Sequence, residues 1–196
     1  MLRPPASRLV ADENFVIDTA RMRLIAAQLA HLRTELADPS QLAALLGVEV
    51  PATWPPGEYD RDAIVYFLSQ YEIRGPEAIG WYGWYAVRRA QGALAAQLVG
   101  AGGYFGPPTA EGTVEIGYSI ADEVRGEGYG TELAQALTER ALRYPGVHRV
   151  IAHVAVDNVA SHKVLKRAGF RFAAVGVSGK QRYERTAKTK SAMMKG

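Results

Sequence analysis

The sequence contains no cysteine among its 196 residues. This absence excludes disulfide bonds, thiolate metal sites and an acyl-cysteine intermediate, and it fits a reducing compartment such as the cytoplasm. The 4 histidines are scattered, and only His148 and His153 lie near each other, at a spacing that is not typical of a metal site. We therefore expect no metal cofactor.

Long apolar runs are absent as well. The longest weakly apolar stretch, residues 92–106, is interrupted by Gln97, is rich in glycine and is too short to span a bilayer. The first fifteen residues contain Pro4-Pro5 and Asp12-Glu13, and they lack the apolar core of a signal peptide. These features predict a soluble, cytoplasmic protein with no membrane partner.

The positive charge is small and unevenly placed. The formal net charge of +3 is carried by the three lysines of residues 188–196, so residues 1–187 sum to zero. A basic tail on a neutral body lacks the concentrated basic face that nucleic-acid binding needs. We predict one domain over residues 1–187, large enough for a core of its own, and a disordered basic tail over 188–196.

Hydrophobic periodicity and turn residues predict an α/β domain. Strands are expected over residues 15–25, 81–88, 98–104, 113–120, 147–156, 170–177 and 181–186. Helices are expected over residues 26–36, 39–46, 60–71, 128–144 and 157–169. The first half of this order is mostly antiparallel, whereas the second half alternates strand and helix.

The most informative segment is the loop Arg125-Gly126-Glu127-Gly128-Tyr129-Gly130-Thr131, which joins a predicted strand to a predicted helix. Its three glycines lack the side chains that would keep a phosphate away from the backbone. The helix that follows directs its free N–H groups and the positive end of its dipole into the same space. This combination predicts a cradle for the phosphates of a nucleotide-bearing cofactor.

Three pieces stand in a fixed order: the strand 115–120, the loop 125–131, and Asn158-Val159-Ala160-Ser161 followed by Gly169-Phe170. Together they resemble the GNAT superfamily of acetyl-CoA-dependent N-acetyltransferases, and within it the branch of the ribosomal-protein N-terminal acetyltransferases. The match covers about residues 113–172, with a weaker echo at 19–25 and no usable match over 26–80. The resemblance implies a central mixed β-sheet flanked by helices, with a cofactor-binding core over about 113–172.

The resemblance also implies where acetyl-CoA binds. The loop would hold the pyrophosphate, the strand end before it would pair with the pantetheine arm, and Asn158 and Ser161 would lie beside that arm near the thioester. The cofactor-binding residues implied in this way are Ser119, Ile120, Arg125, Gly126, Gly128, Tyr129, Gly130, Thr131, Asn158 and Ser161. For Asn158 a simpler role is open too, since asparagine is a preferred N-cap.

Acetyl transfer to an amine needs a base, and it is helped by oxyanion donors and an acid for the leaving thiolate. Glu115 is the candidate base, directly or through a water; an ordinary surface carboxylate is the alternative. Many family members have a tyrosine acid at the position of Leu165, and leucine cannot donate a proton. Ser161 is the proposed substitute, and a backbone N–H near Ser119–Ile120 is the proposed oxyanion donor.

The remaining aromatic and histidine residues receive structural interpretations. His153, in the middle of a predicted strand, is interpreted as a hydrogen-bonded core residue, with a proton shuttle as the less favoured alternative. The aromatic residues of 81–85 are interpreted as core packing. Trp54, in a proline-rich loop, is a candidate for the wall of an acceptor pocket.

Two other functions stay open at this point. Gly126-Glu127-Gly128 begins the fingerprint of a dinucleotide-binding domain, but Thr131 stands where its third glycine would be. A module of the same fold could also bind acyl-CoA without turnover. The acceptor is expected to be a primary amine, either a protein N-terminus or a small molecule, and a homodimer is left open.

Overall fold

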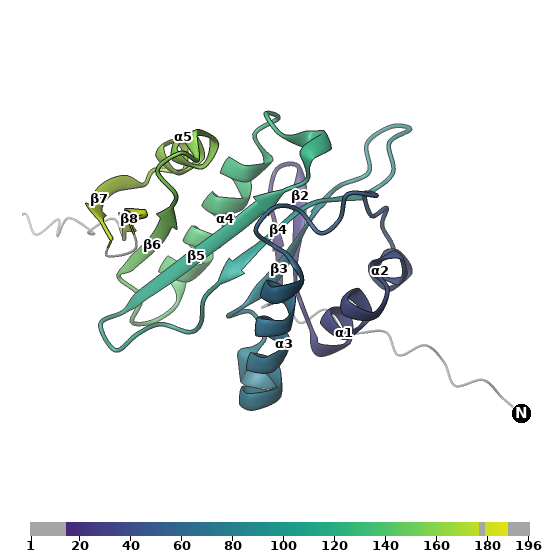
Figure 1. Cartoon of the computed structure of the whole chain (residues 1–196), viewed down its shortest axis with the longest axis horizontal. Coiled ribbons are helices and arrows are strands. Elements are labelled where there is room, and N and C mark those ends of the chain that lie inside the picture. The colour runs from purple at the N-terminus through teal and green to yellow at the C-terminus, as the bar shows by residue number, and fades with distance from the viewer. Residues whose placement is uncertain (1–14, 177–178, 188–196) are drawn as a thin grey trace, which may run out of the picture.

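The computed structural model describes residues 15–176 and 179–187, so the predicted basic tail at 188–196 lies outside the described residues. The described chain forms an 8-stranded sheet in the order β1-β2-β3-β4-β5-β6-β8-β7 (Figure 1). The strands are β1 (Val16–Asp18), β2 (Met22–Ala26), β3 (Gly83–Arg88), β4 (Gln97–Tyr104), β5 (Thr113–Ile120), β6 (Arg149–Val154), β7 (Arg171–Val175) and β8 (Gln181–Thr186). Only β5 and β6 are parallel neighbours within this sheet. The predicted mixed sheet is confirmed.

One predicted strand is wrong, because residues 15–25 form two strands, β1 and β2, joined by a turn. Thr19 makes this turn: its hydroxyl accepts from the Met22 amide at 3.0 Å, and its own amide donates to the Met22 carbonyl at 2.9 Å. The alternation of polar and apolar residues continues through the turn. Periodicity alone therefore predicts one continuous strand where the structure has a hairpin.

The helices cover both faces of the sheet. On one face lie α4 (Tyr129–Arg143) and α5 (Val159–Arg167), and on the other lie α1 (Leu29–Ala37), α2 (Pro39–Leu46) and α3 (Arg61–Arg74) (Figure 1). Short 3₁₀ turns follow α3 (Gly75–Ala78) and β5 (Asp122–Val124). Within the described ranges, no helix has the length and apolarity needed to cross a membrane.

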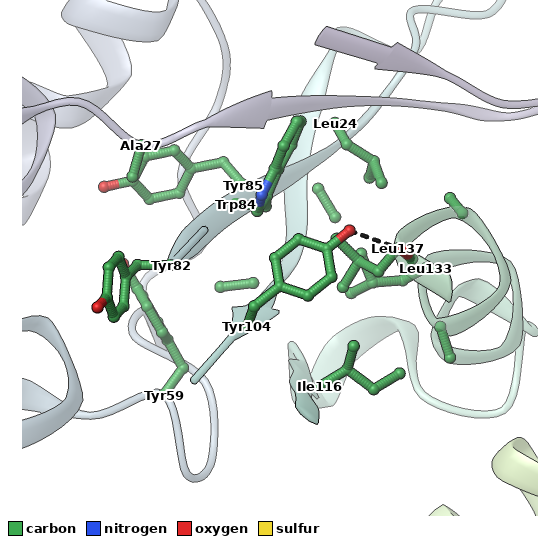
Figure 2. Close-up of a cluster of buried hydrophobic side chains, with 14 of the residues drawn as sticks. Leu24, Ala27, Tyr59, Tyr82, Trp84, Tyr85, Tyr104, Ile116, Leu133 and Leu137 are labelled. Atoms are coloured by element: carbon green, nitrogen blue, oxygen red, sulfur yellow. Dashed lines mark hydrogen bonds between the residues drawn. The ribbon is translucent and has the colours of Figure 1, made fainter. Parts of the chain in front are cut away.

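The core lies on both sides of β3 and β4. Figure 2 shows Tyr104 of β4 pointing at α4, where its hydroxyl donates to the carbonyl of Leu137 at 2.7 Å. Tyr59 and Tyr82 lie on the other side of the cluster from Leu133 and Leu137. The aromatic residues at 81, 82, 84 and 85 are buried, which confirms the packing role expected of them.

The sheet opens between β5 and β6. These strands pair only over Thr113–Glu115 and Arg149–Ile151. Beyond that point β5 stays with β4 as far as Ile120, whereas β6 stays with β8 as far as Val154. The two strands therefore run apart toward their C-terminal ends (Figure 1), and we call the opening between residues 116–120 and 152–156 the splay.

Candidate functional site

A cavity of about 760 Å³ occupies the splay. Its volume falls within the roughly 300–1,000 Å³ of ordinary small-molecule and cofactor sites. Every site residue expected from the sequence lines it: Glu115, Ser119, Ile120, Arg125, Gly126, Gly128, Tyr129, Gly130, Thr131, Asn158 and Ser161. The structure thus brings three separated stretches of chain around one space.

The glycine loop has the backbone that a phosphate cradle requires. Gly126 and Gly128 have φ values of +85° and +89°, which side-chain-bearing residues rarely adopt, and a Cβ on Gly126 would stand in open space. Gly130 lies in close packing, since a Cβ there would be 3.4 Å from Ile120 and Val164. Gly128 is the N-cap of α4, and no side chain caps that end of the helix. The first amides of α4 are therefore free for an anion, and the site fits a pyrophosphate.

Arg125 is held within its own loop. Its Nη2 lies 2.7 Å from the Asp122 carboxylate, and its Nε donates to the carbonyl of Ile120 at 3.3 Å. The guanidinium thus has partners already, although it lines the cavity. The backbone, rather than Arg125, is therefore the stronger candidate for phosphate binding.

The edge of β5 offers free backbone groups to the splay. The amide of Ala121 donates to Val99 and that of Phe105 donates to Glu115, so odd-numbered residues of β5 pair with β4. The N–H and C=O groups of Ile116, Tyr118 and Ile120 consequently point toward the place that β6 has left. An extended ligand arm could pair with this edge as an added strand would.

Asn158 serves as the N-cap of α5, because its Oδ1 accepts from the Ser161 amide at 3.0 Å. The capping interpretation is therefore confirmed, and Asn158 also lines the cavity. Leu165 is fully buried and belongs to the core. Tyr118, which sequence reasoning did not single out, reaches from β5 to α5, with its hydroxyl 3.5 Å from the Ser161 carbonyl. Burial raises the pKa of Tyr118, so this phenol stays protonated at neutral pH.

Glu115 and His153 form a hydrogen-bonded pair across β5 and β6, with Nδ1 of His153 2.8 Å from Oε1 of Glu115. Their side chains are 31% and 29% exposed, and both line the cavity. The interpretation of His153 as a core residue is therefore wrong. His153 does make a hydrogen bond, as expected, but its partner is the candidate base Glu115, which is 38 residues away in sequence.

Further cations line the cavity on the side of α5. They are Lys163, Arg167 and Lys180, none of which sequence reasoning had selected. Lys163 and Arg167 stand four residues apart, so they share a face of α5, and this spacing is a signal that could have found them. Their charge complements the phosphates of a nucleotide-bearing ligand.

The loop of residues 51–60 forms the opposite wall. Trp54 does not line the cavity; its indole N–H donates to the buried carboxylate of Glu35 at 2.6 Å. The expectation that Trp54 lines a pocket is therefore wrong. Gly57 and Glu58 from the same loop do line the cavity, and the Tyr59 amide donates to the hydroxyl of Ser119 at 3.3 Å.

The turn between β1 and β2 braces the glycine loop. Arg21 donates from Nη1 to the carbonyl of Glu127 at 2.9 Å and from Nε to Glu132 at 2.8 Å. Its guanidinium also stacks 4.4 Å above the ring of Tyr129. Thr19 adds a hydrogen bond of 2.6 Å to Glu132. A hairpin that the sequence did not reveal thus holds the first turn of α4 and the loop before it.

We expect Arg21→Met to weaken acetyl-CoA binding by about 3- to 10-fold, because the loop loses a brace of about 1 kcal/mol. Isothermal titration would measure the dissociation constant. Arg23→Met is the matched control, because Arg23 lies in the same hairpin and makes only an exposed ion pair with Asp18. Equal affinities for the two variants would contradict this role of Arg21.

Among the described residues, no group of three or more His, Asp or Glu side chains is placed to hold a metal ion.

Comparison with known proteins identifies the family. A model of the acetyltransferase (GNAT) domain matches residues 28–171. The uncharacterized N-acetyltransferase YjdG of Bacillus subtilis is 30% identical over 155 residues, which cover 79% of this chain and 89% of YjdG. The L-methionine sulfoximine/L-methionine sulfone acetyltransferase of Pseudomonas aeruginosa is 44% identical over 59 residues, covering 30% of this chain and 34% of that protein.

Solved structures share the fold. RimL, the ribosomal L7/L12 alpha-N-protein acetyltransferase in complex with coenzyme A, aligns with a TM-score of 0.57 at 19% identity over 87% of this chain and 97% of RimL. The microcin C7 self immunity acetyltransferase MccE, in complex with acetyl-CoA and AMP, aligns with a TM-score of 0.56 at 17% identity over 86% of this chain and 94% of MccE. The dinucleotide-binding alternative is not favoured by these matches. The chain belongs to the GNAT acetyltransferase family and is an acetyl-CoA-dependent acyltransferase.

Proposed function

We propose that this protein transfers an acetyl group from acetyl-CoA directly to a primary amine. The observation that carries the proposal is the single cavity at the splay. Its α4–α5 side offers the glycine loop, free helix amides and cations, and its other side offers Glu115 and His153. A donor and an acceptor could thus meet through the opening in the sheet without a covalent enzyme intermediate.

The residues divide into two groups in this proposal. Backbone amides of residues 126–131 would hold the pyrophosphate, and the free edge of β5 would hold the pantetheine arm. The amide of Ile120 points into the splay and is the oxyanion donor we favour. When bound, acetyl-CoA supplies an activated acetyl group on a thiol, which leaves readily because its pKa is about 8.5.

The acid and base roles remain proposals as well. Glu115 would provide the carboxylate that accepts the proton of the amine, directly or through a water. Ser161 would assist the leaving thiolate, and the hydroxyl of Ser161 makes no hydrogen bond with any described residue. Tyr118 is a second hydroxyl near this position.

We propose an α-amine as the preferred class of acceptor. An α-amine has a pKa of about 8, against about 10.4 for a lysine-type amine, so it loses its proton far more readily at neutral pH. Two similar proteins point the same way: RimL is named for the α-amine of a ribosomal protein, and the Pseudomonas relative for an amino-acid derivative. Both a protein N-terminus and a free amino acid fit this class.

Adding acetyl-CoA is expected to raise the melting temperature, and adding a suitable amine is expected to release free thiol. Acetyl-CoA at 100 times its dissociation constant would add about 2.7 kcal/mol to the free energy of unfolding. This gain produces a readily measured rise in melting temperature. The amine panel should contain peptides with free N-termini, amino acids, aminoglycosides and polyamines. Stabilisation without thiol release across the panel would favour a module that binds acyl-CoA without turnover.

The extent of the domain is part of the proposal: we assign residues 1–187 to one unit, of which residues 113–172 bind the cofactor. A cytoplasmic location and a homodimer stay predictions from the sequence.

A further inference from the structure

The pair of Glu115 and His153 lies at the vertex of the splay. Glu115 is the last residue of β5 that pairs with β6, opposite Ile151. His153 follows Ile151 by two residues, so it is on the same face of the sheet and about 6.6 Å further along β6. The imidazole therefore stands between the carboxylate and the open end of the splay, where the glycine loop lies.

The hydrogen bond determines which nitrogen of His153 is free. An ionised carboxylate only accepts hydrogen bonds, so Nδ1 of His153 carries the proton that is shared with Oε1 of Glu115 at 2.8 Å. In the neutral imidazole Nε2 is then the acceptor. No described residue bonds this Nε2, and it is not among the buried atoms that lack a partner. Nε2 is thus accessible and basic, on a residue that lines the cavity.

We propose that His153 is a catalytic residue whose Nε2 takes the proton from the acceptor amine, and that Glu115 is the positioning residue that holds and charge-balances the imidazole. The inference rests on the proposed function and names the group that contacts the acceptor. It differs from a direct role of Glu115, which lies where β5 and β6 are still paired and is therefore further from the open end of the splay. A glutamate behind a histidine is an efficient way to orient a general base.

The step is balanced in protons and bonds. The acceptor binds as a neutral amine after its ammonium form has lost one proton to water. As its nitrogen bonds to the acetyl carbon, a second proton moves from that nitrogen to Nε2 of His153, and the carbon–sulfur bond breaks. The imidazolium, stabilised by Glu115, then gives this proton to water, and the departing thiolate takes up one proton with the assistance proposed for Ser161, so free thiol and amide are the products.

Other charged groups face this pair from the neighbouring elements. Arg182 of β8 is the register partner of His153, and its Nε is buried without a partner. Lys180 precedes β8, Lys163 comes from α5, and Glu58 comes from the loop on the other wall; all three line the cavity. Arg182 and the lysines oppose a positive imidazole, whereas Glu115 and Glu58 favour it. Among the described residues, only Glu115 makes a hydrogen bond with the imidazole.

The kinetic test measures thiol release by His153→Gln with saturating acetyl-CoA and a free amine that the wild-type protein acetylates. We expect kcat to fall by about 10²- to 10⁴-fold, with acetyl-CoA affinity changed by no more than about 2-fold. The acid limb of the kcat pH profile should disappear, and added imidazole should restore activity to His153→Ala. Exposed His148, just before β6 and outside the cavity, provides the control His148→Gln. Near-wild-type kcat in His153→Gln, with the acid limb intact, would overturn the inference.

A second readout does not depend on turnover. In protein labelled with ¹⁵N-histidine, NMR should show one Nδ1-protonated neutral imidazole, whose signal is lost in His153→Gln and shifted in Glu115→Ala. An Nε2-protonated tautomer at His153 would overturn the inference even in an active enzyme. Failure of the proposed function looks different, because then the wild-type protein itself releases no thiol with any amine.

Discussion

Replacement of Gly126 by valine is expected to weaken acetyl-CoA binding by roughly 30- to 1,000-fold, because two or three amide–phosphate hydrogen bonds are lost or misaligned. Gly126 has a φ of +85° and faces open space in the cavity. A branched side chain there both forces the loop from its conformation and fills the space that a phosphate would take. Isothermal titration would measure the affinity.

Gly146 provides the matched control for this substitution. It has a φ of +84°, a Cβ on it would also meet nothing within 4 Å, and it does not line the cavity. We expect Gly126→Val and Gly146→Val to lower the unfolding free energy by a similar amount, about 1–3 kcal/mol. Only Gly126→Val should lose affinity. Equal affinity in both variants would mean that the loop does not hold the phosphates.

Substitution of Glu35 by leucine is expected to lower the unfolding free energy by about 3 kcal/mol or more. Glu35 is 2% exposed and accepts hydrogen bonds from Trp54, Tyr59 and Tyr85, at 2.6, 2.9 and 2.6 Å. Leucine would leave these three donors buried without an acceptor. Glu72→Leu is the control, because its exposed pair with Arg33 contributes little. Chemical denaturation would measure both, and equal losses would contradict the importance of the buried carboxylate.

Glu35 also makes the free energy of unfolding depend on pH. Burial raises the pKa of Glu35 above its ordinary value of 4.5, and the hydrogen bonds from Tyr85, Trp54 and Tyr59 only partly oppose this. The folded state therefore binds the proton more tightly than the unfolded state. The contribution of Glu35 to the free energy of unfolding is therefore greatest below pH 4.5. It is lost as the pH rises from 4.5 to the raised pKa of the folded state. In Glu35→Gln this decline should be missing.

A consequence for activity follows from where Glu35 lies. Through Trp54 and Tyr59 it anchors the loop that carries Gly57 and Glu58 to the cavity wall. We therefore propose that this network positions the cavity wall against which the acceptor amine would bind. The sequence alone does not reveal it, since the four side chains come from α1, the 51–60 loop and β3, and nothing local to any of them signals the others.

The cofactor half of the site was predictable from the sequence. The glycine loop, the strand before it and the helix after it are contiguous, and their conformations follow from residue types at short spacing. The acceptor half was not. The sequence indicates only that His153 lies within a strand. The register of β5 against β6 places it beside Glu115, with which it forms a hydrogen bond.

By itself the sequence determined the strands and helices from residue 26 onward, the glycine loop and the family resemblance, because these depend on neighbouring residues. The tertiary structure decided where β5 and β6 part, and with it the cavity, the Glu115–His153 pair and the brace from Arg21. Those features join residues that are 38 and 106 positions apart. Contacts over such separations depend on strand register and packing, which no local pattern encodes.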